Sequence, residues 1–474
     1  MDNKKGKLQL SNKLAFAVGD FFGGGSFNII NFMYPGFLAL TVGLSPFWIG
    51  FIMFVARVWD AVSDPLMGRI SDGASNQKFG KRRVFIVISA PLIVLAMFLM
   101  FYPFAFESEA LRILAVLFSY IFFCTVQTMF MIPYYALSSE LSYDYQERAS
   151  ANSFRLGFSI FSSILCVSLP GIIVNMVGGD KGYIVMSVTF GLLFGACMLT
   201  TGLFTKEEII TPPVKKAFSF VEFTKFLKIR PFTQYLGLLL CTQMTMAIMS
   251  ALYFFFIDFY ICRDITSTGT TSALGLIGAA LMFSMQIVAL PFYLKLINKT
   301  SKAFTFRVGG CLWVLMGLLF FTLQPGAPAW LILLYATLVG FGISGPGLVP
   351  HTMFGDVVDV AKLITGERNE GAMSGLVNFV NKIAQAIGLS LVMGALGFFQ
   401  FTEKQAGGPA VLTQPESAQM AIRIIMCFAP LIFISVGMLI SKKYIIDAKK
   451  QQEVKNALET NDEKAIEQLK KEFI

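Results

Sequence analysis

Three charged residues interrupt an apolar segment near the start of the chain. Arg57, Asp60 and Asp64 follow at steps of three and four residues, so a helix places them on one stripe. Inside a membrane, each charge would cost about 2.5 to 3.5 kcal/mol at the bilayer centre, so the stripe must face a polar interior and have partners. Two carboxylates one turn apart, with hydroxyl oxygens nearby, offer the hard oxygen ligands that suit a sodium ion. The same pair could instead share one proton, because close carboxylates in a low dielectric resist double ionisation.

Polar residues also recur at helical spacing in two other apolar segments. In the first segment, Asp20, Asn28 and Asn31 share one face, where they can hydrogen-bond to the hydroxyl groups of a solute. In a later segment, Lys382 lies among apolar residues, with three amide side chains at helical spacing. A buried lysine needs an anion, and the two carboxylates of the charged stripe are the natural candidates.

The composition of the chain is that of an integral membrane protein. Of its 474 residues, 55% are hydrophobic and 14% are charged, and the mean hydropathy is +0.67; soluble domains have about 25% charged residues. The net charge of +9 comes from short lysine and arginine clusters between apolar segments. This pattern favours an orientation signal over a nucleic-acid partner. The polar amino terminus has no small-residue cleavage site before the first apolar run, so no cleaved signal peptide is expected.

Twelve segments are long and apolar enough to span a bilayer, at about 20 residues for each span. The odd connections between them are short or nearly neutral, and the even ones hold the basic clusters. By the positive-inside rule, the even connections and both termini are cytoplasmic, in an inner (plasma) membrane. The predicted segments are 13–40, 46–71, 83–103, 110–138, 151–177, 182–204, 232–258, 270–297, 303–323, 328–355, 370–400 and 417–441.

A basic central connection divides the segments six and six. A faint repeat supports this division. In each half, a proline that follows an apolar residue (Pro133 and Pro350) is itself followed, about 15 residues later, by a Glu-Arg pair. Twelve helices in two equivalent halves, with inward termini, describe the all-α major facilitator architecture. The tail alternates lysine and glutamate and predicts a solvated cytoplasmic helix. The predicted parts are a six-helix bundle at 1–204, a cytoplasmic loop at 205–231, a six-helix bundle at 232–441 and a cytoplasmic tail at 442–474.

The connection after the second segment resembles the motif that joins the second and third helices of major facilitator transporters. It has a glycine, an aspartate at the helix end, and arginines after a tight loop. The resemblance implies a cytoplasmic gate latch, and the alternative is a solvated charged loop. A second charged cluster at the cytoplasmic end of the tenth segment is expected to pair across the halves when the inside is closed. The predicted gating residues are Arg57, Asp72, Arg82, Arg83, Asp356, Asp359, Glu367 and Arg368.

Several motifs together resemble one family within this superfamily, the glycoside-pentoside-hexuronide:cation symporters of the melibiose permease type. They occur in family order between residues 19 and 388, which is almost the whole membrane domain. Several such motifs in sequence are a strong signal where any one would be weak. The motifs are Gly19-Asp20-Phe21, Val42 to Ser45, Arg57 to Pro65, Ile132 to Leu137, Glu147-Arg148 with Asn152 to Arg155, Asp356 to Asp359, Gly366 to Gly371 and Asn381 to Gly388.

The resemblance implies a cation site at the charged stripe. Asp60 and Asp64 are then the cation-binding carboxylates, assisted by Ser63 and Thr128. The family usually has asparagine where this chain has Ser63, which leaves the ion open between sodium and a proton. The alternative is that both carboxylates are only salt-bridged, to Arg57 and Lys382.

The resemblance also places Tyr135 and Arg155 at the solute site and Lys382 beside the cation site, although Arg155 could instead reach the cytoplasmic interface. This chain has Gly24 and Met131 where the melibiose permease has two sugar-binding aspartates. Galactoside specificity is therefore not expected, and an anionic sugar such as a hexuronide is favoured. The predicted solute-binding residues are Asp20, Asn28, Asn31, Tyr135, Arg155 and Lys382.

These features predict a secondary active symporter that couples inward movement of sodium or a proton to uptake of a glycoside, pentoside or hexuronide. It would work as a monomer by alternating access. One alternative is the same fold carrying an amphipathic solute such as a lysolipid, and another is a non-transporting sensor. The sequence holds no phosphate loop, no nucleophile with its base and no metal motif. Neither enzymatic activity nor a cofactor other than the coupling ion is expected.

Overall fold

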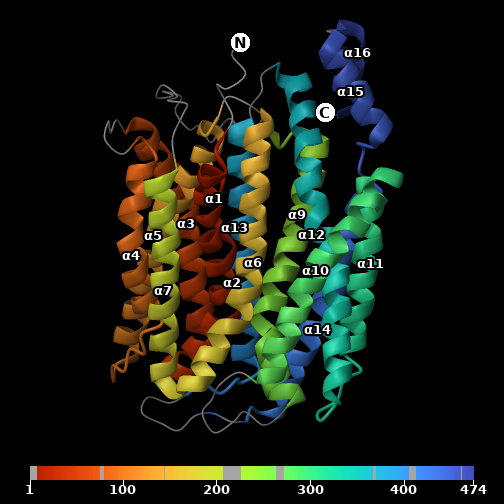
Figure 1. Ribbon diagram of the computed structural model, residues 1–474. Coiled ribbons are helices and arrows are strands. Elements are labelled where there is room, and N and C mark those ends of the chain that lie inside the picture. Colours follow the sequence, from red (N-terminus) through yellow and green to blue (C-terminus); the bar gives the residue numbers. More distant parts are fainter. Residues whose placement is uncertain are drawn as a thin grey trace. The chain divides into compact units, whose positions relative to one another are not determined.

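The computed structural model describes residues 8–74, 80–142, 145–205, 226–262, 272–366, 370–404, 411, 413–460 and 462–473. Within these residues every regular element is a helix (Figure 1). Most of the predicted central loop, at 206–225, and the predicted gate residues Glu367 and Arg368 lie outside the described residues.

Each of the first six predicted segments corresponds to helical structure. The first segment is a run of two α-helices and one π-helix, with Gly19 between the α-helices. The remaining five are single helices, and Pro46 opens the first of these, where a proline costs no intrahelical hydrogen bond. The elements are α1 (Leu10–Val18), α2 (Asp20–Phe37), η1 (Leu38–Val42), α3 (Pro46–Gly73), α4 (Arg83–Met100), α5 (Glu109–Glu140), α6 (Tyr145–Val177) and α7 (Gly179–Phe204).

The last six predicted segments are also helical, and the seventh again ends in a π-helix. Of the described helices, eleven have the length and apolarity needed to cross a membrane. Together with the first helical run, they confirm the predicted all-α fold of twelve membrane segments. The elements are α9 (Arg230–Phe255), η2 (Phe256–Ile261), α10 (Ala273–Lys299), α11 (Lys302–Phe320), α12 (Ala329–Thr365), α13 (Glu370–Phe398), α14 (Glu416–Lys442), α15 (Ala448–Thr460) and α16 (Glu463–Phe473).

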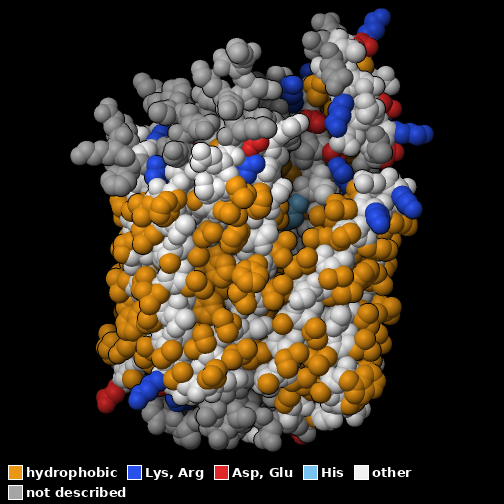
Figure 2. All heavy atoms as spheres, viewed as in Figure 1, with side chains coloured by type: hydrophobic (Ala, Val, Ile, Leu, Met, Phe, Trp, Pro, Cys, Tyr) orange, Lys and Arg blue, Asp and Glu red, His pale blue; other side chains and the backbone are white. Residues whose placement is uncertain are grey.

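The outer faces of the helices are apolar. Large side chains such as Phe118, Leu192 and Val288 are more than half exposed. On the face seen in Figure 2, hydrophobic side chains cover the middle of the helices, and charged side chains lie near the helix ends. Such an extent of exposed apolar surface is unusual for a protein in water, and it suits contact with lipid.

The chain forms two compact units. The first holds residues 1–216, 253–280 and 390–419, and the second holds residues 217–252, 281–389 and 420–474. In the first unit, parts of α10 and α13 therefore pack against amino-terminal helices. Ser390 Oγ donates to Gly50 O at 3.1 Å, and Ser168 Oγ donates to Leu276 O at 3.2 Å. The six-and-six division of the sequence stays a prediction.

The carboxy-terminal tail differs from the solvated helix that its composition predicts. It forms two helices, α15 and α16, whose apolar residues Val454, Leu469 and Phe473 are buried against α12 and its neighbours. Between the two helices, Lys450 Nζ lies 2.7 Å from Glu472 Oε2. The hydrogen bond to Glu472 raises the pKa of Lys450, so the stability that this pairing adds is present at neutral pH and is lost as the pH rises through that pKa. Composition gave the wrong prediction because a narrow apolar stripe is sufficient to dock a highly charged helix on its neighbours.

Phe473→Ala is expected to release α16. Phe473 is 0% exposed, and loss of a buried phenyl ring costs about 3 to 5 kcal/mol. Trypsin should therefore cleave the variant's tail at Lys470 and Lys471 faster than it cleaves the wild type. Gln468→Ala, on the exposed face of α16, should be cleaved at the wild-type rate. Equal cleavage of Phe473→Ala and the wild type would contradict the docked tail.

Candidate functional site

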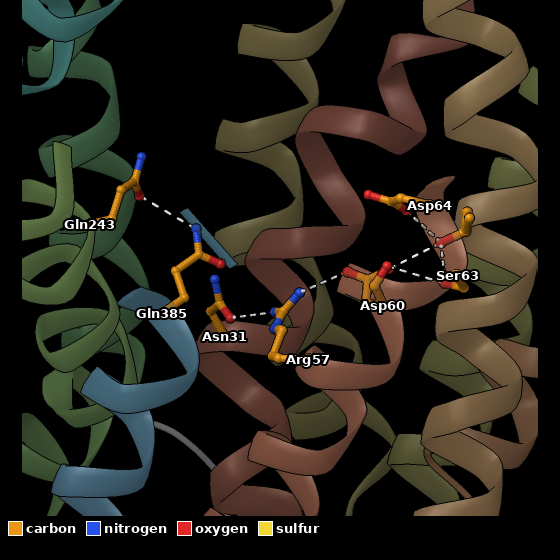
Figure 3. Close-up of polar contacts among 8 residues, drawn as sticks. Asn31, Arg57, Asp60, Ser63, Asp64, Gln243 and Gln385 are labelled. Carbon is orange, nitrogen blue, oxygen red and sulfur yellow. Dashed lines mark hydrogen bonds and ion pairs between the residues drawn. The ribbon is translucent and has the colours of Figure 1, made fainter. Parts of the chain in front are cut away.

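The acid pair of α3 meets a hydroxyl from α5. Thr128 Oγ1 lies 3.0 Å from Asp60 Oδ1 and 2.9 Å from Asp64 Oδ1. Ser63 Oγ lies 3.2 Å from Thr128 Oγ1. Asp60, Ser63 and Thr128 are buried, and Asp64 is half-buried. Figure 3 shows Asp60, Ser63 and Asp64 directed toward one another from the same helix. Four oxygen atoms from two helices thus converge in a buried place.

The single hydroxyl hydrogen of Thr128 cannot serve both carboxylates at once, because a hydroxyl donates one hydrogen bond at a time. Close carboxylates also repel each other strongly in a low-dielectric interior. A monovalent cation or a proton placed among these oxygens would relieve that repulsion. The arrangement can therefore bind a small cation, and the residues present suit either sodium or a proton.

Arg57 forms an ion pair with Asp60, which lies one turn away on the same helix. Its Nη1 lies 4.0 Å from Asp60 Oδ2, its Nη2 donates to Asn31 Oδ1 at 3.3 Å, and its Cζ lies 4.8 Å from the centre of the Phe27 ring. The side chain therefore joins α2 to the acid pair (Figure 3). The predicted gate residue Asp72 lies 15 residues further along the same helix, about 22 Å away at 1.5 Å per residue. The structure thus places Arg57 beside the acid pair and apart from Asp72, and a gating role for Arg57 stays a prediction.

Lys382, the predicted counter-charge, lies on α13 in the second unit. One turn further along α13, Gln385 Nε2 donates to Gln243 Oε1 of α9 at 3.4 Å (Figure 3). The pairing of Lys382 with the acid pair stays a prediction.

Three of the predicted solute-binding residues come together from α2, α5 and α6. Arg155 Nε lies 3.9 Å from Asp20 Oδ2, and Arg155 Cζ lies 5.5 Å from the centre of the Tyr135 ring. That ion pair is too long for a hydrogen bond, and Arg155 Nε has no hydrogen-bond acceptor in the described part of the chain. Asn28, by contrast, donates to Gly24 O of its own helix at 3.0 Å.

The close crossing of α2 and α6 explains why Gly24 stands where an aspartate was expected from the resemblance. A Cβ at Gly24 would lie 2.5 Å from Ser159 O and 2.9 Å from Ser159 Cα. The backbone of α6 therefore occupies the space that a side chain would need. Ser163, which the sequence interpretation missed, donates to Gly24 O at 3.2 Å. Small residues on both helices were the available signal for this contact.

Another face of α6 lines a pocket of about 650 Å³. At 3.6 residues per turn, this face lies well away from the direction of Arg155. Sequence interpretation did not identify this pocket, although its residues recur at helical spacing. The lining residues are Ser150, Ser153, Phe154, Gly157, Phe158 and Phe161.

The predicted latch is built around Arg82, which is buried just before α4 and contacts the last turn of α3. Arg82 Nη2 lies 2.5 Å from Asp72 Oδ1 and 3.2 Å from Glu140 Oε1, and its Nη1 donates to Ser71 Oγ at 2.7 Å. Glu140 was missed because it lies 58 residues away in the sequence. Arg83 instead donates to the carbonyl oxygens of residues 202 and 203, at 2.7 and 2.8 Å, near the end of α7.

In the second predicted gate cluster, Asp356 forms an ion pair and a hydrogen bond with residues of its own unit. Asp356 Oδ2 lies 2.5 Å from Lys302 Nζ, and Asp356 Oδ1 accepts a hydrogen bond from Gln451 of the tail. Asp359, three residues further along α12, is half-buried. Pairing of these acids across the two halves stays a prediction.

Comparison with known proteins supports a transporter. A protein of Synechocystis described as an uncharacterized symporter is 26% identical, over 96% of this chain and 98% of that protein. Sodium-dependent lysophosphatidylcholine symporters of zebrafish (1-B) and human (1) are 24% and 23% identical, over 94% and 96% of this chain and 89% of each relative.

Solved structures share the fold at low sequence identity. The nucleoside transporter NupG has a TM-score of 0.61 at 13% identity, covering 90% of this chain and 98% of that chain. A bacterial homologue of the lysosomal transporter Spinster has a TM-score of 0.63 at 12% identity, covering 92% and 96%. The narrower resemblance to glycoside-pentoside-hexuronide symporters stays a prediction. The family model described as "MFS/sugar transport protein" matches residues 15–448, so the chain belongs to this family of multi-pass membrane transporters of the major facilitator type.

Proposed function

We propose that this protein couples inward movement of one sodium ion or one proton to uptake of a sugar by alternating access. The observation that carries the proposal is the position of Thr128 Oγ1, within 3.0 Å of both Asp60 and Asp64. Ser63 completes the set of oxygen ligands. The carrier would act as a monomer in the plasma membrane with both termini in the cytoplasm, an orientation supported by the basic even-numbered connections.

The charges of the cluster favour a single monovalent cation. Counting only the residues of the first unit, Arg57, Asp60 and Asp64 together carry a net charge of about −1 when both acids are ionised. A sodium ion or a proton brings this sum to zero, whereas a divalent ion would overshoot. A neutral cluster is the form that a closed, water-poor intermediate tolerates. The loaded carrier can therefore close, and the empty carrier resists closure.

Arg57 offers a route for coupling between the two sites. It contacts Asp60 on one side and Asn31 of α2 on the other, and α2 also carries Asp20. A cation that competes with Arg57 for Asp60 would change the hydrogen bond between Arg57 and Asn31 of α2. Coupling free energies of this kind are typically about 1 to 3 kcal/mol, and they act equally in both directions.

The solute would bind at Arg155, Asp20 and Tyr135. Because Arg155 and Asp20 are held at ion-pair distance without a hydrogen bond, a solute carboxylate can take the guanidinium in a bidentate pair. The half-exposed ring of Tyr135 offers an apolar face to a sugar ring. These features favour an acidic sugar such as a hexuronide.

A lysolipid is the second candidate solute. The observation in its favour is the phenylalanine-lined pocket on α6, which offers an apolar surface to an acyl chain. The vertebrate relatives named as lysophosphatidylcholine symporters point the same way.

An uptake panel in proteoliposomes tests the proposal and separates the two solutes. Labelled hexuronide, pentoside, galactoside and lysophosphatidylcholine would each be offered with a sodium gradient, with a proton gradient and with neither. Accumulation of hexuronide under one gradient alone is expected, with little galactoside uptake. If lysophosphatidylcholine is the one compound taken up under a gradient, the solute is a lysolipid and not a sugar. Solute binding without flux in any condition would contradict a transport function.

A further inference from the structure

Two π-helical turns lie in the first unit, η1 at Leu38–Val42 and η2 at Phe256–Ile261. Turns of this kind are rare and occur frequently at functional sites. Residues 399–404, which follow α13, contact both of them, and these residues are called the strap. By the positive-inside prediction, the strap lies at the non-cytoplasmic side, because it belongs to the connection between the last two membrane segments.

The strap is hydrogen-bonded to η1 through the backbone. Leu44 N donates to Leu38 O at 2.9 Å, and Lys404 N of the strap donates to Ala39 O at 3.0 Å. The carbonyl groups at a helix end need such partners from outside the helix. Nearby, Arg112 Nη1 donates to Val42 O at 3.0 Å, so two elements hold the end of η1.

Gly43 makes the close approach of the strap to η1 possible. It ends η1 with a φ of 72°, in the left-handed region. A Cβ at this position would lie 2.1 Å from Lys404 O. Any other residue would therefore strain the backbone and also push the strap away.

The strap packs on η2 through one aromatic side chain. Phe401 is 4% exposed, and its ring centre lies 5.3 Å from that of Phe255 and 5.7 Å from that of Phe259. Both contacts are edge-to-face, which is a favoured arrangement. The adjoining Phe398 is 81% exposed and makes no comparable contact with η2 among the described residues.

The strap is also held in shape by its own connection. Gln414 Oε1 accepts from Thr402 N at 2.8 Å, and Gln414 Nε2 donates to Thr402 O at 2.9 Å. Gln400 adopts a φ of 59°, which is uncommon for a residue other than glycine. A segment held in shape by hydrogen bonds to its own connection can bind and leave η1 and η2 as one piece.

We propose that the strap is an outer gate, whose docking across η1 and η2 closes the non-cytoplasmic end of the first unit. This inference rests on the proposed alternating-access function, in which each end must open in turn. Solute entry from outside then requires Lys404 to leave Ala39 and Phe401 to leave Phe255 and Phe259. Closing the gate re-forms these contacts before the cytoplasmic end opens.

The test measures hydrogen exchange of peptides covering 399–404 in the full-length protein in nanodiscs. Gly43→Ala and Phe401→Ala are each expected to speed exchange there by about tenfold or more, because both release the strap. Gly326→Ala is the matched control for the first, since Gly326 also has a positive φ of 79° but a Cβ there would meet open space. Phe398→Ala is the matched control for the second, and both controls should exchange like the wild type.

The same four variants are then compared for solute uptake in proteoliposomes. The two strap variants should lose most of their uptake while still binding the coupling cation, and the two controls should transport normally. Two results would overturn the gate proposal. One is hydrogen exchange at 399–404 that stays at the wild-type rate in Gly43→Ala and Phe401→Ala, and the other is normal uptake by variants whose strap exchanges faster. Hydrogen exchange does not depend on the solute, so a wild-type protein that takes up no panel solute would instead count against the proposed function.

Discussion

Asp60→Asn and Asp64→Asn are each expected to reduce cation-driven accumulation of solute in vesicles to the level seen without a gradient. Each change removes one of the two carboxylates that meet at Thr128 Oγ1. With one carboxylate left beside Arg57, the cluster is close to neutral without a cation, so a cation gains little by binding. The carrier then loses its driving ion. Solute exchange between the two sides of the membrane should persist, because Asp20, Tyr135 and Arg155 are unchanged.

The measurement is uptake of the solute identified by the panel, under gradient and counterflow conditions, at equal amounts of inserted protein. Glu109→Gln, at the exposed start of α5, removes an acid away from the site and should accumulate solute like the wild type. Full gradient-driven uptake by the double variant Asp60→Asn with Asp64→Asn would exclude this pair as the cation site. If a variant loses both solute exchange and accumulation, the substitution has damaged the structure of the carrier.

Arg57→Met is expected to lower both stability and coupling. Arg57 is 4% exposed and lies beside the buried Asp60. Removal of one partner of a buried ion pair commonly costs about 3 to 5 kcal/mol, because the other charge stays buried. The variant should unfold at a clearly lower temperature in detergent, and Arg57→Lys should recover part of the loss.

A double-mutant cycle separates the ion pair from simple packing. Arg57→Met combined with Asp60→Asn removes both charges, so it should be more stable than Arg57→Met alone. Arg307→Met on α11, where the guanidinium lies 5.8 Å from the Phe304 ring centre, is the control for loss of an arginine elsewhere. If the double variant is no more stable than the single one, Arg57 does not act on Asp60 as an ion-pair partner.

The features that the sequence predicts well are local ones. A run of about 20 apolar residues has few alternatives to a membrane helix, because only internal hydrogen bonds satisfy its backbone in lipid. Helical periodicity places Asp60 and Asp64 on one face without any knowledge of their neighbours. For this reason the twelve segments and the acid stripe follow from the sequence alone. The same periodicity, applied to the tail, would also have shown its apolar stripe.

Contacts between helices depend on quantities that one segment does not contain. The rotation of α5 about its axis puts Thr128 between the two acids, and its length brings Glu140 to Arg82. The depth of the α2 and α6 crossing is set by Gly24, which lets a backbone fill the place of a side chain. Such distances follow from the packing of both helices together.

The sequence by itself determined that this is a membrane protein of twelve segments with an acid pair on its second segment. The tertiary structure decided which groups meet that pair and which do not. It placed Arg57 between Asp60 and Asn31, and it brought the strap onto η1 through the space left at Gly43. The physical reason is that hydrophobicity and helical period are properties of a single segment. A shared site exists only once separate segments have packed at a fixed depth and rotation.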